Sequence, residues 1–259
     1  MQWRSRFHEA VKPALFHLAC SALIALLAAS LVFGVWYPSP YDQLAGGRDL
    51  LRYIVLVDVI CGPLLTFLVF DRQKSRRALV TDIGAIVLLQ LLALGYGLHS
   101  MAQARPVFLA YEGSRYRLVS AADVDKESLP LARPEFQSLP LTGPQWIGVR
   151  VSQETDRDFP ASVQLSLAGL HSAFRPQRWV PYDNQVDAVR AALLPLENLL
   201  AKHPDDRELV NAALLKHGLK PQQVGYLPLS AEKASSPDWV VLVERKSGEP
   251  SGFLPLDGW

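Results

Sequence analysis

Two long apolar segments joined by a short basic loop constrain this chain more than any other feature of its sequence. Residues 52–70 and 78–99 each have about the length and composition of a helix that crosses a bilayer. The loop between them, residues 71–77, is so short that the two helices must run antiparallel as neighbours. The sequence therefore predicts a transmembrane hairpin.

Four polar residues interrupt the apolar hairpin at matching heights. Counted from the loop, Asp58 is level with Gln90 at roughly 18 Å, and Thr66 is level with Asp82 at roughly 6 Å. An acidic residue deep in a membrane helix raises the free energy of insertion by about 2.5 to 3.5 kcal/mol. One interhelical hydrogen bond stabilises the helices by only about 0.6 to 2 kcal/mol. We therefore expect Asp58 to be protonated, paired, or in contact with a polar group of another chain.

The sequence leaves open whether Asp58 stabilises the hairpin internally or meets a partner. Asp82 has a simpler expected role, an ion pair with Arg76 or Arg77 of the basic loop. Gly62 and Pro63 lie one turn beyond Asp58, and a proline inside a helix removes a backbone hydrogen bond and bends the axis. This break either shapes the helix bundle or opens a groove beside Asp58 for a partner helix.

A third apolar segment precedes the hairpin and is expected to be an uncleaved span, because it runs directly into Trp36 and Tyr37 instead of a cleavage site. Lysine and arginine are concentrated before this span and in the loop that contains Lys74, which the positive-inside rule places in the cytoplasm. The predicted segments are a cytoplasmic basic N-terminus (1–13), spans at 14–36, 52–70 and 78–99, a periplasmic loop (37–51), a cytoplasmic basic loop (71–77) and a periplasmic domain (104–259).

The C-terminal domain has the alternating and helical patterns of an α+β fold with a mainly antiparallel sheet. A hairpin is predicted around the turn at residues 112–114, and two helices are expected over 184–202 and 206–217, the first broken at Pro195 and the second stopped by Gly218. Further strands are predicted at 145–151, 223–229, 239–244 and 252–256.

Composition and motif spacing favour a protein without catalytic or metal chemistry. A net charge of +1 argues against nucleic-acid binding. His171, His203 and His217 lack metal-ligand spacing, and Asp156 and Asp158 are expected to be solvated, not paired for acid/base work. We therefore predict no enzyme activity, no metal and no cofactor.

Several motifs in the membrane half, taken in order, resemble the type IV pilin accessory protein family (TfpX/TfpZ). The likeness covers residues 30–120 well and the ending 253–259, and is loose between 121 and 222. The motifs are Trp36-Tyr37-Pro38, Gly46-Gly47, Asp58 with Gly62-Pro63, Lys74, Asp82, Gln90, Tyr96-Gly97 and Ala104-Arg105-Pro106-Val107.

This resemblance implies a non-enzymatic chaperone of the bacterial inner membrane that holds a type IV pilin subunit before its assembly into pili. The pilus assembly machinery is a further candidate partner, beside the lipid bilayer. The hypothesis assigns partner binding to Asp58, Gly62, Pro63, Thr66 and Gln90, and structural or orienting roles to Lys74, Arg76, Arg77, Asp82, Arg105 and Pro106.

Two other functions are compatible with the sequence. One is a membrane-anchored sensor whose periplasmic domain binds a small ligand, although the chain has no cytoplasmic output module. The other is an enzyme subunit or transporter fragment that uses Asp58 for proton movement, although three spans with one deep carboxylate argue against it.

Overall fold

The computed structural model describes residues 2–231 and 239–259, with side chains from Glu9 onward. Arg4 and Arg6 of the predicted basic N-terminus therefore lie outside the described side chains. The chain forms two compact units: a helical unit, Met1–Pro38 with Gly47–Gln103, and a C-terminal unit, Ser39–Gly46 with Ala104–Trp259. Each unit is described separately below.

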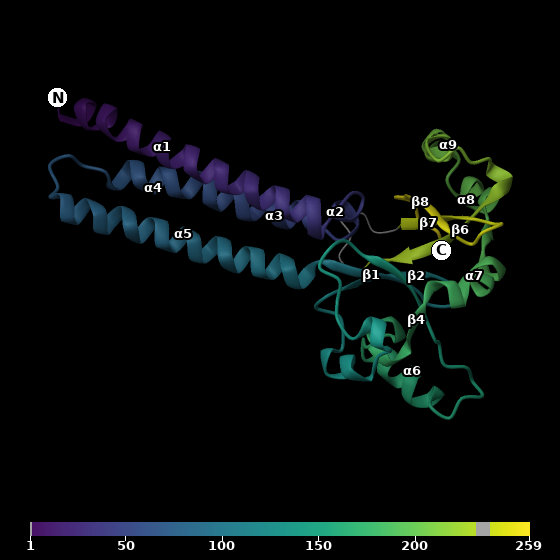
Figure 1. Ribbon diagram of the computed structural model, residues 1–259. Coiled ribbons are helices and arrows are strands. Elements are labelled where there is room, and N and C mark those ends of the chain that lie inside the picture. Colours follow the sequence, from purple (N-terminus) through teal and green to yellow (C-terminus); the bar gives the residue numbers. More distant parts are fainter. Residues whose placement is uncertain (1, 232–238) are drawn as a thin grey trace. The chain divides into compact units, whose positions relative to one another are not determined.

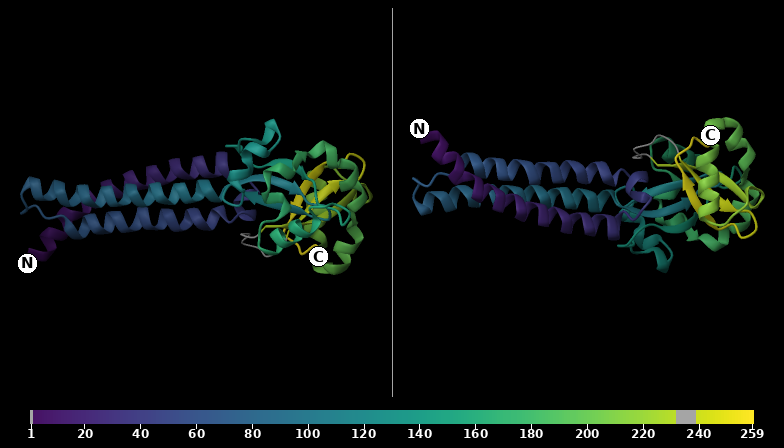
Figure 2. Two further views of the ribbon diagram at one scale, coloured as in Figure 1. Left: turned by 90° about the horizontal axis from the view of Figure 1, so that it is seen from below. Right: turned by 90° about the horizontal axis from the view of Figure 1, so that it is seen from above.

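The helical unit contains three stretches that are long and apolar enough to cross a membrane, at Glu9–Trp36, Gly47–Val69 and Arg76–Ala104. Figures 1 and 2 show its long helices lying side by side. The second stretch is assembled from three consecutive elements, of which the middle one is a π-helix. The elements are α1 (Gln2–Leu31), η1 (Val32–Trp36), α3 (Gly47–Leu56), η2 (Val57–Cys61), α4 (Gly62–Val69) and α5 (Arg76–Ala104).

Small residues and a few polar contacts hold these helices together. Helix α1 packs along α4 and η2, whereas α5 is mostly exposed and is buried at Ile86, Gly97 and Met101. A Cβ atom on Gly97 would lie 2.8 Å from Ile54 of α3, so glycine permits this close approach. Further along α5, the buried hydroxyl of Tyr37 donates to the Met101 carbonyl at 2.9 Å.

The C-terminal unit is built on a mixed sheet with the strand order β4-β3-β1-β2-β6-β7-β8, and β5 pairs with β6 off this path. The expectation of a mainly antiparallel sheet is wrong, because β3 runs parallel to β1 and β6 runs parallel to β2. The strands are β1 (Pro106–Tyr111), β2 (Tyr116–Ser120), β3 (Gln145–Val149), β4 (Trp179–Pro181), β5 (Leu194–Pro195), β6 (Val224–Ser230), β7 (Trp239–Glu244) and β8 (Pro250–Leu254).

Short helices connect these strands, and the unit is therefore an α/β domain. The α-helices are α2 (Tyr41–Leu44), α6 (Phe159–Leu167), α7 (Val186–Ala192), α8 (Leu196–Lys202) and α9 (Arg207–Lys216). The 3₁₀ turns are η3 (Lys126–Leu131), η4 (Pro134–Phe136), η5 (Ser172–Phe174), η6 (Pro176–Arg178), η7 (Tyr182–Gln185), η8 (Pro204–Asp206) and η9 (Pro221–Gln223).

Local sequence signals locate several of these elements correctly. The predicted hairpin is confirmed, since β1 and β2 pair antiparallel around a turn in which Gly113 has a φ of 77°. The predicted break at Pro195 is also confirmed: α7 ends at Ala192, and the chain is extended before α8. Gly218 adopts a φ of 65° directly after α9 and ends that helix.

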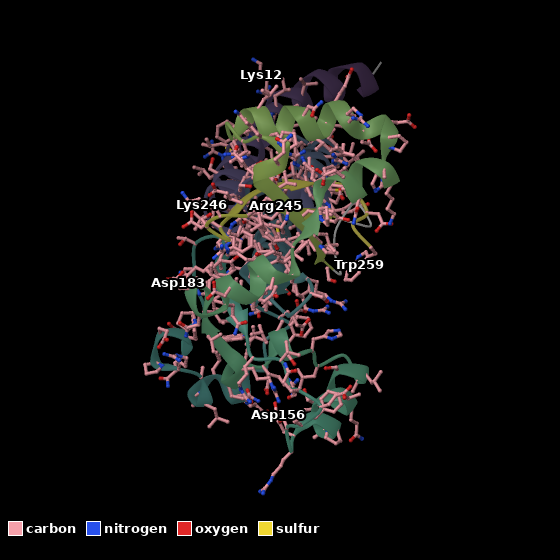
Figure 3. The ribbon with its side chains drawn as sticks, turned by 90° about the vertical axis from the view of Figure 1, so that its right-hand side faces the viewer. Lys12, Asp156, Asp183, Arg245, Lys246 and Trp259 are labelled. Atoms are coloured by element: carbon pink, nitrogen blue, oxygen red, sulfur yellow. The ribbon has the colours of Figure 1, made fainter. Side chains whose placement is uncertain are left out.

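Two hydrophobic clusters form the core of the C-terminal unit. The first surrounds β1, β2 and β3 and includes Phe108, Phe136 and Trp179, whose rings contact one another. In the second, α8 and α9 cover one face of β6, β7 and β8. Figure 3 shows Asp156 among the segments around α6, away from Arg245 and Lys246 beside the last strands.

A group of aromatic side chains lies between the strands of the C-terminal unit. Trp146 stacks on Phe253 and also contacts Tyr116 and Tyr182. The hydroxyls of Tyr116 and Tyr182 are 2.6 Å apart, and Tyr182 also donates to the Gly248 carbonyl. Burial raises the pKa of Tyr182 to about 12 and also raises the pKa of Tyr116, so both phenols stay protonated at neutral pH.

Candidate partner-binding groove in the helical unit

An apolar groove of about 330 Å³ runs between α3 with η2 on one side and α5 on the other. Each wall is one face of a helix, because the lining positions recur with a spacing of three and four residues. The α3 and η2 wall consists of Leu50, Tyr53, Ile54, Val57 and Asp58, and the α5 wall of Ala93, Leu94, Tyr96, Gly97, Ser100 and Met101.

The rims of the groove are exposed aromatic rings, and its acidic residue is buried. Tyr53 and Tyr96 are 69% and 76% exposed, whereas Asp58 is 6% exposed. Ala93 adds little side-chain volume to the α5 wall, so the backbone of another helix could come close there. The groove therefore combines apolar walls with one carboxyl group.

Gln90 of α5 holds the Asp58 residue in place. Its Nε2 donates to the backbone carbonyl of Asp58 at 2.8 Å and lies 3.4 Å from the Asp58 Oδ1. The level placement of Asp58 and Gln90 predicted from sequence is therefore confirmed as a contact.

The helix break explains why the Asp58 carbonyl needs a side-chain donor. In a π-helix each carbonyl pairs with the N–H five residues on, and for Asp58 that residue is Pro63, which has no N–H. Gln90 supplies the missing donor. Gly62 makes room for it, because a Cβ there would lie 2.2 Å from the Gln90 Nε2.

Thr66 is also held inside the unit, but by a partner that the sequence did not indicate. Its hydroxyl lies 2.6 Å from the Nδ1 of His17 on α1, and Thr66 is 1% exposed. Asp82, which the sequence places level with Thr66, instead forms an ion pair at 2.8 Å with Lys74.

The remaining predicted orienting residues have local roles. Lys74, not Arg76 or Arg77, is the partner of Asp82, and it also donates to the Val69 carbonyl, which closes the basic loop. In the C-terminal unit, Arg105 donates to the Pro140 carbonyl at 3.3 Å. Pro106 begins β1, where a missing N–H is tolerated.

The structure thus divides the predicted partner-binding residues into two sets. Asp58 lines the groove, whereas Gly62, Thr66 and Gln90 contact neighbouring helices inside the unit. Sequence reasoning missed most of the groove walls. Leu50, Tyr53, Ile54 and Val57 do have the spacing of one helix face. That spacing cannot be recognised in this segment, because nearly every position in it is apolar.

The C-terminal unit corrects one expectation about charged residues. Asp158 is not merely solvated: it pairs with Arg178 and accepts from the Ser152 hydroxyl. The Nε2 of His203 lies 2.8 Å from the Asp257 carbonyl, and His171 packs edge-on against Phe174. In the described ranges, no group of three or more His, Cys, Asp or Glu side chains could hold a metal ion.

Comparison with known proteins places the chain among fimbrial assembly proteins. A family model described as fimbrial assembly protein FimB matches residues 5–46. The chain is 33% identical over 243 residues to the fimbrial assembly proteins of serogroups I and E1 of Dichelobacter nodosus, which covers 93% of each chain. It is 38% identical over 129 residues to the protein of serogroups C1 and C2, covering 50% of this chain and 98% of that relative.

No solved structure shows significant similarity to the chain. The sequence similarity nonetheless extends well beyond the motifs around residues 30–120, into the segment where the motif resemblance is loose. On the identity and coverage of these relatives, this chain belongs to the fimbrial assembly protein family.

Proposed function

We propose that this protein is a non-enzymatic membrane chaperone that binds a type IV pilin subunit before it is assembled into pili. The TfpX/TfpZ resemblance of the motifs in the helical unit supports this finer assignment within the fimbrial assembly family. The pilin is the expected partner because, before assembly, it presents one long apolar helix in the membrane and a globular head outside.

The observation that carries the proposal is the groove between α3 with η2 and α5. Two parallel stripes of apolar side chains with a small-residue floor form a surface on which a single helix can lie. In this proposal the pilin helix lies along the groove, and the C-terminal unit contacts the pilin head.

Asp58 gives the groove its selectivity in this proposal. The carboxyl group is buried at one end of an apolar surface, and Gln90 and Gly62 fix its backbone without filling the groove. A polar or positively charged group on the bound helix could donate a hydrogen bond to the Asp58 carboxylate, whereas an entirely apolar helix would leave that carboxylate with only its 3.4 Å contact to Gln90.

The proposed topology has three spans in the bacterial inner membrane. The basic N-terminus and the loop closed by Lys74 and Asp82 face the cytoplasm, and the C-terminal unit faces the periplasm. A periplasm-active reporter fused after Trp259 is expected to be active, and a reporter active only in the cytoplasm would contradict this topology.

Filling the groove tests the proposed binding directly. Ala93→Trp places a large ring on the α5 wall, and Ala85→Trp places the same ring on an exposed part of α5 outside the groove. We expect tagged full-length protein carrying Ala85→Trp to co-purify with pilin from membranes at the normal level. The Ala93→Trp protein should lose most of the pilin.

Two results would contradict the proposed function. Equal recovery of pilin with both variants would show that the groove is not the binding surface. Failure of the unmodified protein to recover any pilin, at normal levels of both proteins, would exclude the chaperone role itself.

A further inference from the structure

A second cleft, in the C-terminal unit, has a composition quite unlike that of the groove. It encloses about 410 Å³ beside α6 and the turn of the β1–β2 hairpin. Polar side chains form one part of its lining and apolar side chains the other. The lining residues used below are Glu112, Arg117, Ser162, Ser172, Val163 and Leu167.

Buried arginines lie beside this cleft, and two of them pair with a carboxylate. Arg117 pairs with Glu112 at 2.9 Å, and Arg178 pairs with Asp158. Arg175, which is 3% exposed, forms no ion pair within the described chain. One buried positive charge is therefore left without a carboxylate partner.

Arg175 reaches the cleft through two serines. Its Nη2 lies 2.7 Å from both the Ser162 and the Ser172 hydroxyl oxygens, and both serines line the cleft. Since each oxygen accepts from the guanidinium, each hydroxyl proton can be donated toward the cleft. The Arg175 Nε is buried and has no hydrogen-bond partner among the described residues, and the two carboxylates that attract its charge, Glu112 and Asp158, each pair with another arginine.

The other part of the lining is apolar and contributes Val151, Phe159, Val163 and Leu167. A free inorganic anion would gain nothing from these side chains. A carboxylate on a peptide carries a negative charge, which Arg175 and the cleft-lining Arg115 attract, and the peptide's neighbouring apolar side chains can cover the rest of the surface.

We propose that this cleft is a second binding site, which recognises a carboxylate side chain flanked by apolar residues in a peptide segment of a partner protein. The Ser162 and Ser172 hydroxyls donate to the carboxylate, and Arg175 behind them supplies the positive charge. This proposal concerns a different surface from the groove and does not depend on the identity of the membrane partner.

Matched peptides test the assignment on the full-length protein in lipid nanodiscs. The probes are the blocked peptide acetyl-Gly-Val-Glu-Val-Gly-amide, the same peptide with glutamine at the centre, and inorganic phosphate, each titrated by calorimetry. We expect the glutamate peptide to bind at least about tenfold more tightly than the glutamine peptide, since a charge-assisted hydrogen bond is stronger than a neutral one. Its affinity should fall as salt is added.

Two variants and one control assign the binding to this cleft. The double variant Ser162→Ala with Ser172→Ala, and separately Arg175→Gln, should each abolish the preference for glutamate. Arg133→Gln removes one exposed positive charge elsewhere on the unit and should leave the preference unchanged. If Arg175→Gln does not fold, the serine double variant still decides the outcome.

Three results would overturn the proposal. The first is that the glutamate and glutamine peptides bind equally tightly, or that neither peptide binds. The second is a glutamate preference that persists in the serine double variant. The third is that phosphate binds and the glutamate peptide does not. That result would identify a site for an inorganic anion instead.

Discussion

The helical unit and the C-terminal unit bury polar side chains in opposite ways. In the helical unit, buried polar groups are few, and single contacts from a neighbouring helix hold two of them: Gln90 donates to the Asp58 carbonyl, and His17 contacts Thr66. In the C-terminal unit, buried arginines form a network with carboxylates and serines.

This difference follows from the surroundings of each unit. In the proposed membrane topology, apolar helices that face lipid gain little from burying more apolar surface, so a few polar contacts and small residues fix how they pack. The sheet of the C-terminal unit has hydrophobic cores of its own, which can support a charged cluster at their edge. Both proposed binding surfaces lie beside a buried ionisable side chain, Asp58 in the groove and Arg175 behind the cleft.

The largest expected effect is the loss of a buried ion pair in the C-terminal unit. Glu112→Gln removes the carboxylate that pairs with the buried Arg117 at 2.9 Å and should destabilise the unit by about 3 to 5 kcal/mol. Urea titration of the solubilised full chain, followed by tryptophan fluorescence, measures this change. Glu135→Gln is the control, because the exposed pair of Glu135 with Arg133 should contribute nothing measurable; equal losses in both variants would contradict the network described here.

A smaller effect is expected where the helical unit depends on a glycine. Gly62→Leu forces its side chain into Gln90 and should cost about 1 to 3 kcal/mol through overpacking. Gly84→Leu is the matched control on α5, where a Cβ meets nothing within 4 Å. The thermal midpoint of helical circular dichroism in detergent should fall for the first variant only, and equal midpoints would show that Gln90 relocates freely.

The contact between Asp58 and Gln90 should appear as an energetic coupling. In a double-mutant cycle of Asp58→Ala and Gln90→Ala, we expect the stability effects to be non-additive by about 0.6 to 2 kcal/mol. Part of the contact goes to the Asp58 backbone, which alanine retains, so the coupling should lie toward the lower end of that range. Additive effects would argue against a side-chain interaction.

A further effect is expected only at alkaline pH and concerns the aromatic group of the C-terminal unit. Burial raises the pKa of Tyr182 to about 12, so the folded state keeps a proton that the unfolded chain releases near pH 10. The resulting stability is complete below pH 10 and is lost as the pH rises from about 10 toward 12. Tyr182→Phe should show a shallower loss of stability over this range, and an unchanged slope would contradict the assigned burial.

The sequence predicts the fold well wherever a local signal decides the structure. The three apolar stretches, the hairpin turn at Gly113 and the break at Pro195 all follow from residue type and spacing. The parallel pairings of β3 with β1 and of β6 with β2 could not be predicted in this way, because they join segments that are distant along the chain.

The candidate sites were predictable only in part, for the same reason. Counting residues from the loop places Asp58 level with Gln90, but it gives no information about α1, and the contact of His17 with Thr66 was therefore missed. Likewise, the arginine cluster depends on Arg117, Arg175 and Arg178, which come together only when η5 and η6 fold against the sheet.

Site-specific photocrosslinking in living cells tests the central claim most directly, with a benzophenone amino acid placed at Tyr53 or at Leu88. Both positions are exposed on the helical unit, at 69% and 59%, but only Tyr53 lines the groove. If the groove holds the pilin helix, position 53 gives a pilin adduct and position 88 does not. Adducts from position 88 alone, or from neither position while pilin is present in the membrane, would contradict the proposal.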